Sequence, residues 1–189
     1  MEYKQKKQVL AISGSTRQNS TNRNFINAIT AFSKNDFNVI FFDKLSELPH
    51  FNPDSNIKNI PKEVIHFKKL LNNADGVIIC TPEYAHGVPG TLKNAIDWTI
   101  STNEFVQKPT MLITASTDGQ YGHKALLEIL RIIETKDIDQ LHLLIQFAKT
   151  KINSKSEIID EKTLIDIKQL IRKFTKVLIK KADEKTVEN

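Results

Sequence analysis

The 189-residue chain has a single cysteine, only 6 glycines and 6 prolines, and few aromatic side chains, which make up 7% of the total. One cysteine excludes an internal disulfide framework and suits a reducing compartment. We expect Cys80 to be a buried strand residue, because it ends the apolar run GVIIC. Long hydrophobic runs are also missing: the first, VLAI, is too short for a signal peptide or a membrane span. We therefore predict a cytoplasmic protein without a membrane partner.

The formal net charge of +5 is compatible with nucleic-acid binding, but the sequence lacks the other signs of it. The lysines are scattered, and no pattern of aromatic side chains suits base stacking. We expect no nucleic-acid partner and attribute the charge to attraction of small anions such as nucleotides. No spacing of histidine, cysteine or carboxylates indicates a metal site, so we expect none.

Short apolar runs alternate with segments of helical period along the whole chain. This alternation predicts one α/β domain over residues 1–189, with a five-stranded parallel sheet wrapped by helices on both faces. The last ten residues, from 180, are polar and expected to fray. The predicted strands are 9–13, 38–43, 76–81, 110–116 and 141–147, and helical stripes fall within 25–32, 64–71, 92–99, 126–133 and 164–178.

The segment SGSTRQNSTN, residues 13–22, lies between the first strand and the first helix, where open parallel sheets bind ligands. It contains neither the glycine pattern of dinucleotide folds nor a Walker motif, and it has no cysteine for a phosphatase of the cysteine type. Its hydroxyls, its guanidinium Arg17 and the free N–H groups of a helix start suit a phosphate monoester. The alternative is plain helix capping by Asn19 or Ser20.

The segment TPEYAHGVPG, residues 81–90, holds two of the six glycines and two of the six prolines. Pro82 keeps the strand extended, Gly87 is expected to take a positive φ, and Pro89 with Gly90 turns the chain into the next helix. We expect a stiff loop whose backbone groups are satisfied from outside, for example by the edge of a flat heteroaromatic ring. The alternative is a purely structural turn.

Both loops resemble signatures of the NADPH-dependent FMN reductase family. GSTRQNSTN resembles its phosphate loop GSxRxxSxN, and PEYAHGVPGTLKNAIDW resembles its second signature, PEYxxxxPGxLKNAIDW. The match runs over residues 12–98, and TASTDGQYG (114–122) stands where that family has a third flavin loop. The chain departs in two places: Gly119 and Gly122 are separated where the family often has a Gly-Gly pair, and AHG replaces the Asn-containing PEYN of many relatives.

The resemblance implies a flavodoxin-like, doubly wound sheet of order 2-1-3-4-5. In this order the loops after the first and third strands, residues 13–22 and 81–90, meet at the switch point and bind two ends of one molecule. It implies an NAD(P)H-dependent FMN reductase that passes hydride from NADPH to FMN and on to a flavin, quinone, azo compound or metal oxyanion. No side chain is expected to be catalytic, because the cofactor does the chemistry. The implied FMN-binding residues are Ser15, Arg17, Ser20, Thr21, Asn22, Pro82, Glu83, Tyr84, Ala85, His86, Ser116, Thr117, Asp118 and Gly119.

Two histidines and one charge pair have alternative interpretations. His86 and His123 are possible proton donors to an acceptor, but we expect loop packing for His86 and a polar helix start for His123. Glu83 and Lys93 are a possible ion pair, with a solvated charge as the alternative.

In the same family LKNAIDW contributes to subunit contacts, which implies that Leu92, Ile96 and Trp98 face a partner chain in a homodimer or homotetramer. Packing of Trp98 within its own fold is the alternative. Two other function classes stay open: an electron-carrying flavodoxin, whose usual acidic face the charge of +5 does not match, and a flavin-binding regulator.

Overall fold

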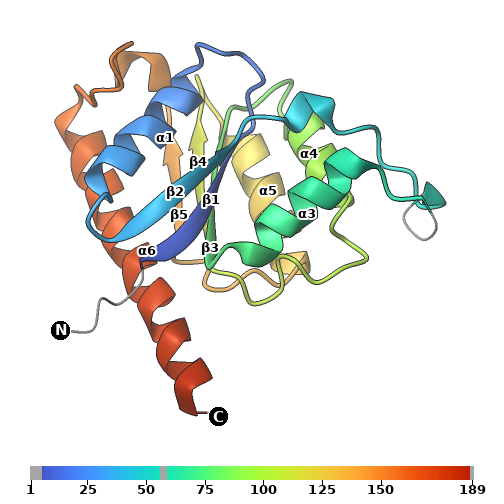
Figure 1. Cartoon of the computed structure of the whole chain (residues 1–189). Helices are drawn as coiled ribbons and strands as arrows, with labels where there is room; N and C mark the ends of the chain where they lie inside the picture. The colour runs from blue at the N-terminus through green and yellow to red at the C-terminus, as the bar shows by residue number, and fades with distance from the viewer. Residues whose placement is uncertain (1–5, 56–58, 188–189) are drawn as a thin grey trace.

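The predicted apolar runs form one parallel sheet in the computed structural model, which describes residues 6–55 and 59–187, with side chains up to residue 179. The sheet order is β2-β1-β3-β4-β5, and every neighbouring pair is parallel, which confirms the predicted doubly wound topology (Figure 1). The strands are β1 (Lys7–Ser13), β2 (Phe37–Phe42), β3 (Gly76–Thr81), β4 (Thr110–Ala115) and β5 (His142–Ile145).

Helices cover both faces of the sheet, and each face has its own hydrophobic core (Figure 1). α1 (Thr21–Phe32) and α6 (Glu161–Val187) pack on one face. The other face is covered by α3 (Lys62–Asn73), α4 (Gly90–Asp97) and α5 (Gln120–Ile132). Two short 3₁₀ turns, η1 (Leu45–Glu47) and η2 (Ala148–Thr150), follow β2 and β5. The polar segment 180–187 lies within α6, and its fraying stays a prediction.

Burial explains which strands the sequence pattern found most accurately. Every residue of β3 and β4 is buried, so their apolar runs are nearly continuous, as central parallel strands require. β2 lies at the edge of the sheet, where Asn38 and Ile40 are exposed, and its true start is Phe37, one residue earlier than predicted. Phe37 is anchored there by an edge-to-face contact with Phe174 of α6, at 5.6 Å between ring centroids.

The prediction that Leu92, Ile96 and Trp98 face a partner chain is wrong. Each is only 1% exposed and packs inside its own fold. The Trp98 indole N–H donates to the carbonyl oxygen of Pro49 at 2.8 Å, and its ring meets Phe51 edge-on at 5.2 Å. This apolar helix face therefore belongs to the core between α4 and the segment after β2.

Candidate functional site

The loops after β1 and β3 touch because Gly14 has no side chain. Its N–H donates to the carbonyl oxygen of Cys80 at 2.8 Å, and a Cβ built on Gly14 would lie 2.1 Å from the Thr81 hydroxyl oxygen. These strands are neighbours whose crossovers leave on opposite sides, which is the switch point of the sheet. The two predicted ligand loops therefore share one edge, as expected.

The β1 loop (residues 13–22) is organised by its own hydroxyl groups. The Ser13 hydroxyl accepts from the Ser15 N–H at 3.2 Å, and the Ser15 hydroxyl is 3.4 Å from the Arg17 N–H. The Ser20 hydroxyl caps α1 by accepting from the Arg23 N–H at 3.1 Å. Capping and ligand binding are thus compatible here, because the N–H groups of the first helical residues have no partner within the helix and remain available to an anion.

Asn22 differs from the other polar side chains of this loop. It is 4% exposed, and its side-chain oxygen accepts from the Cys80 thiol at 3.3 Å. Burial raises the pKa of that thiol, so Cys80 is an inert core residue and not a nucleophile. Asn22 can therefore offer its backbone N–H to a ligand, while its side-chain oxygen is engaged in the core.

The loop after β3 is a tight turn closed by two backbone hydrogen bonds. The Tyr84 N–H donates to the Gly87 oxygen at 3.1 Å, and the Gly87 N–H donates to the Tyr84 oxygen at 2.9 Å. The residues with positive φ are Ala85 (47°) and His86 (56°), so the predicted positive φ of Gly87 is wrong. The backbone N–H and carbonyl groups of Tyr84 and Gly87 are therefore satisfied within the loop, whereas we expected the loop's backbone groups to be satisfied from outside. The His86 ring stacks on Tyr121 at 4.3 Å.

Glu83 joins the β3 loop to the start of α5. Its carboxylate accepts from the Gly122 N–H at 2.5 Å and lies 3.3 Å from the Gly119 N–H. Gly119, with φ 90°, begins this helix without a side-chain cap of its own, so Glu83 supplies the missing acceptor. A Cβ on Gly122 would lie 3.0 Å from the Gly87 oxygen, which explains why the two glycines stand apart: one turns the chain and the other admits the neighbouring loop.

Both interpretations of the Glu83 charge, an ion pair with Lys93 or a solvated side chain, are therefore wrong. Lys93 instead pairs with Asp97 one turn further along α4, at 2.5 Å. Glu83 is half-buried, and its backbone N–H also reaches the Ser116 hydroxyl at 3.3 Å. A carboxylate placed between two loops holds them at a fixed separation.

A pocket of about 280 Å³ lies where the loops after β1, β3 and β4 converge. Ten of the predicted site residues line it: Ser15, Arg17, Ser20, Thr21, Asn22, Pro82, Glu83, Tyr84, Ser116 and Thr117. Four predicted residues lie outside its lining: Ala85, His86, Asp118 and Gly119. The structure adds Asn19 and Ala115, and also Ala148 and Lys149 after β5, which the sequence reasoning missed although they follow a predicted strand at the same edge.

His123 lies in the first turn of α5, at the helix start that we expected, and its side chain is buried. It is 6% exposed and lies between the Thr114 hydroxyl, 2.8 Å from its Nδ1, and His142, whose Nδ1 is 3.0 Å from its Nε2. Burial first, and then the neighbouring His142, lower the pKa of His123 to about 4. His123 is therefore neutral at pH 7, and its hydrogen bond to Thr114 links the start of α5 to the end of β4.

Residues 6–55 and 59–187 include neither a candidate metal-binding cluster nor a helix that could span a membrane. No group of three or more histidine, cysteine or acidic side chains among them could hold a metal ion. In the same ranges, no helix has the length and apolar character needed to cross a membrane.

Comparison with known proteins agrees with this geometry. A family model described as NADPH-dependent FMN reductase matches residues 8–150. An NADH-dependent flavin reductase subunit 2 from Lactobacillus johnsonii is 30% identical over 183 residues, covering 89% of this chain and 95% of the relative. A 2-hydroxy-1,4-benzoquinone reductase from a Burkholderia species is 28% identical over 162 residues, covering 82% and 87%. Among solved structures, FerB, a flavoenzyme NAD(P)H:(acceptor) oxidoreductase from Paracoccus denitrificans, has the same fold, with a TM-score of 0.77 at 24% identity over 92% of this chain and 98% of that one.

Proposed function

The chain belongs to the NADPH-dependent FMN reductase family, and from that premise we propose that it holds FMN in the pocket between the loops after β1, β3 and β4. Its family makes it an FMN-dependent NAD(P)H oxidoreductase. The observation that carries the proposed site is the convergence of an acid-free phosphate loop with two further loops that Glu83 holds together.

The donor set of the β1 loop fits the phosphate of FMN. Residues 13–22 contain five hydroxyls, one arginine and no carboxylate. The phosphate would be held by Ser15, Arg17 and Ser20, together with the N–H groups of Thr21 and Asn22 at the positive end of the α1 dipole. A dianion at this position gains charge-assisted hydrogen bonds without meeting a like charge.

The flavin ring would lie against the backbone of the β3 loop. Pro82, Glu83 and Tyr84 line the pocket, and we assign Ala85 and His86 to the rim of the same site. Residues 116–119 would close the other side, with Ser116 and Thr117 in the lining and Asp118 and Gly119 next along the chain. Because the Tyr84–Gly87 turn and the Glu83 carboxylate fix these loops, a planar ring would meet preorganised backbone groups.

When bound, FMN supplies the redox chemistry, in which two electrons and a proton taken from NAD(P)H leave to a second acceptor. The protein binds and orients the reactants, and no acidic or basic side chain is required. His123 takes no part as a proton donor, because it is neutral and hydrogen-bonded on both ring nitrogens. His86 is exposed, and its ring stacks on Tyr121 of α5.

A planar conjugated acceptor, such as a quinone or an azo compound, is the second substrate that we infer. Relatives that resemble this chain over most of its length are named flavin and quinone reductases. Tyr84 lines the pocket and is 52% exposed, so its ring is available at the mouth to stack on such an acceptor. Free flavin and a metal oxyanion are the other acceptors that we propose. Steady-state turnover rates measured with each class of acceptor would show which one the enzyme reduces fastest.

We also propose that the chain works in the cytoplasm as a homodimer or homotetramer. The reduced Cys80 suits that compartment. Ile100, Val106 and Ile132 are exposed around a cavity of about 570 Å³ beside α5, and such an apolar patch suits burial against a second copy. A molar mass from light scattering equal to one chain would contradict this assembly.

The site is tested by titrating the apo-protein with FMN and following the quenching of flavin fluorescence. Arg17→Gln should weaken binding by roughly tenfold, because a charge-assisted hydrogen bond to phosphate is lost. Arg172→Gln, an exposed arginine of α6, is the matched control and should bind as the wild type does. Equal affinities of the two variants would contradict the proposed phosphate site.

The alternative function is a flavodoxin-like carrier or a flavin-binding regulator. The net charge of +5 speaks against a carrier with the usual acidic face. Such a protein would bind FMN with the same residues but would show negligible turnover with NAD(P)H and any acceptor.

A further inference from the structure

A second cavity, of about 650 Å³, lies on the other side of the β1 loop from the proposed FMN pocket. We call it the β2-side groove; its walls are the β1 loop, one face of α1, the end of β2 with η1, and residues 154 and 156. Ser15, Arg17 and Asn19 line both cavities, so the β1 loop is their common wall. A ligand in the groove would therefore lie next to the phosphate end of the cofactor.

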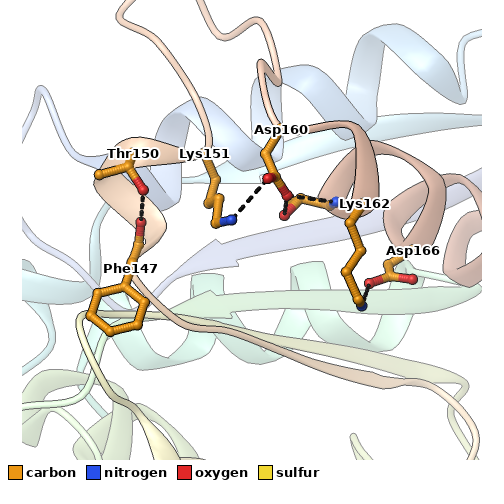
Figure 2. A network of polar contacts seen from close by, with 7 residues as sticks. Phe147, Thr150, Lys151, Asp160, Lys162 and Asp166 are labelled. Atoms are coloured by element: carbon orange, nitrogen blue, oxygen red, sulfur yellow. Dashed lines mark hydrogen bonds and ion pairs between the residues drawn. The ribbon is translucent and has the colours of Figure 1, made fainter.

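One wall of the groove comes from an excursion of the chain between β5 and α6. The two ends of this excursion are joined by an ion pair between the Lys151 ammonium and the Asp160 carboxylate at 2.8 Å (Figure 2). Asp160 also caps α6 by accepting from the Thr163 N–H at 2.9 Å. These partners hold the pKa of the Asp160 carboxyl well below its usual range, Lys151 first and Thr163 next. Ile152 and Ile158 pair across the excursion as an antiparallel bridge.

The tip of the excursion is tied to α1. The side-chain amide of Asn24 donates to the Asn153 carbonyl oxygen at 3.1 Å, and that of Asn27 donates to the Ser156 hydroxyl at 3.3 Å. The base of the same excursion supplies Ala148 and Lys149 to the FMN pocket. One segment thus contributes to both cavities, and hydrogen bonds to α1 fix the position of its tip.

The charges in the groove favour an anion that also carries hydroxyl groups. Arg17 and Arg23 supply two positive charges, and Asp43 supplies one negative charge. Among the residues that the structure describes, neither arginine forms an ion pair. The Arg23 guanidinium lies over the Phe41 ring at 4.7 Å, a contact that orients the group without neutralising it. Serine and asparagine side chains make up most of the remaining lining.

We propose that the β2-side groove binds the adenosine-phosphate end of the nicotinamide nucleotide, an inference that rests on the proposed function. Arg23 binds a phosphate group, since a guanidinium matches phosphate oxygens in two-pronged geometry, and Arg17, which we assign to the FMN phosphate on the common wall, adds positive charge beside it. Asp43 follows the end of β2, the position from which a carboxylate accepts from ribose hydroxyls in related parallel sheets. The common wall places the groove beside the FMN pocket, toward which the nicotinamide end would extend.

The test uses FMN-loaded protein and ADP-ribose, which carries the adenosine-phosphate end without the nicotinamide. We expect ADP-ribose to bind in calorimetry and to compete with NADH and NADPH in steady-state assays. Arg23→Gln should weaken ADP-ribose about tenfold and raise the KM for both nucleotides by a similar factor, because one charge-assisted hydrogen bond is lost. The kcat and the affinity for FMN should not change, and Arg172→Gln should match the wild type in every measurement.

Asp43→Asn gives a second readout. Removing this negative charge should raise the affinity for NADPH relative to NADH several-fold, because the 2′-phosphate no longer meets a carboxylate. ADP-ribose binding that is absent, or equal in Arg23→Gln and Arg172→Gln, would overturn the proposal, as would an unchanged nucleotide ratio in Asp43→Asn. Apo-protein that binds FAD tenfold more tightly than FMN, with the difference lost in Arg23→Gln, would assign the groove to the cofactor and also overturn it. The FMN titration of the wild type reports separately on the proposed function.

Discussion

Removing the Glu83 carboxylate should loosen the flavin site without touching the phosphate loop. In Glu83→Ala, the Gly122 and Gly119 N–H groups lose the acceptor that ties the β3 loop to the start of α5. A hydrogen bond to a charged group contributes about 1.5–3 kcal/mol, and half-burial of Glu83 favours the lower end for the 2.5 Å bond. The 3.3 Å contact adds little, so we expect a total loss of about 2 kcal/mol.

This loss divides between two measurable quantities. Changes in the unfolding free energy of the apo-protein, from urea titration, and in the free energy of FMN binding, from fluorescence, should sum to about 2 kcal/mol. If the loops separate in the apo-protein, most of the loss falls on binding, up to roughly thirtyfold in Kd. Glu83→Gln keeps one acceptor oxygen and should lose about half as much.

Glu128→Ala is the matched control, because Glu128 is an exposed carboxylate on the same helix and pairs only at the surface with Arg131. In Glu128→Ala, the unfolding free energy and the free energy of FMN binding should each stay within about 0.5 kcal/mol of the wild type. The reasoning would be refuted if Glu83→Ala also stayed within that margin in both assays.

Three further substitutions or probes test the structure around the site. Gly14→Ala puts a Cβ 2.1 Å from a β3 hydroxyl oxygen and should cost about 1–3 kcal/mol in urea unfolding, whereas Gly90→Ala, with nothing within 4 Å, should be neutral or slightly stabilising; equal effects would contradict the packing argument. The pKa of His123 is about 4 in the native protein against an ordinary 6.5, so the unfolded chain binds the extra proton and Tm should fall as pH drops from 6.5 to 4. This fall in Tm at acid pH should shrink in His123→Gln and persist in His66→Gln. An unaltered dependence of Tm on pH in His123→Gln would refute the role of His123. Cys80 should react with a thiol reagent such as DTNB only at the rate of unfolding, because it is 0% exposed and burial raises its pKa; rapid labelling of native protein would contradict this.

The sheet and the place of the site could be predicted because they depend on local patterns. Fully buried strands such as β3 read as continuous apolar runs, and the rule that ligands bind at the carboxyl ends of parallel strands located the loops. The cap at Ser20 was likewise visible as a local signal.

Contacts between distant segments could not be predicted. Glu83 and Gly122 are far apart in sequence, and nothing in either segment shows that a carboxylate reaches the start of α5. The positive φ in the β3 loop fell on Ala85 and His86 because the Tyr84–Gly87 hydrogen bonds set the register of the turn, which overrides the preference of glycine for that conformation.

The indole of Trp98 shows the same limit. Its motif implied a partner chain, but the acceptor that buries it is the Pro49 carbonyl oxygen, from a segment about fifty positions earlier. The β2-side groove also went unpredicted, because its walls come from four separate segments and carry no shared sequence motif.

The most direct test of the central claim is anaerobic reduction of the FMN-loaded protein, followed by the visible absorbance of the flavin in a stopped-flow instrument. Addition of NADPH or NADH should bleach the flavin band rapidly, and a quinone added afterwards should restore it. Bound yellow flavin that neither nucleotide reduces would contradict the reductase assignment and favour a carrier or regulator.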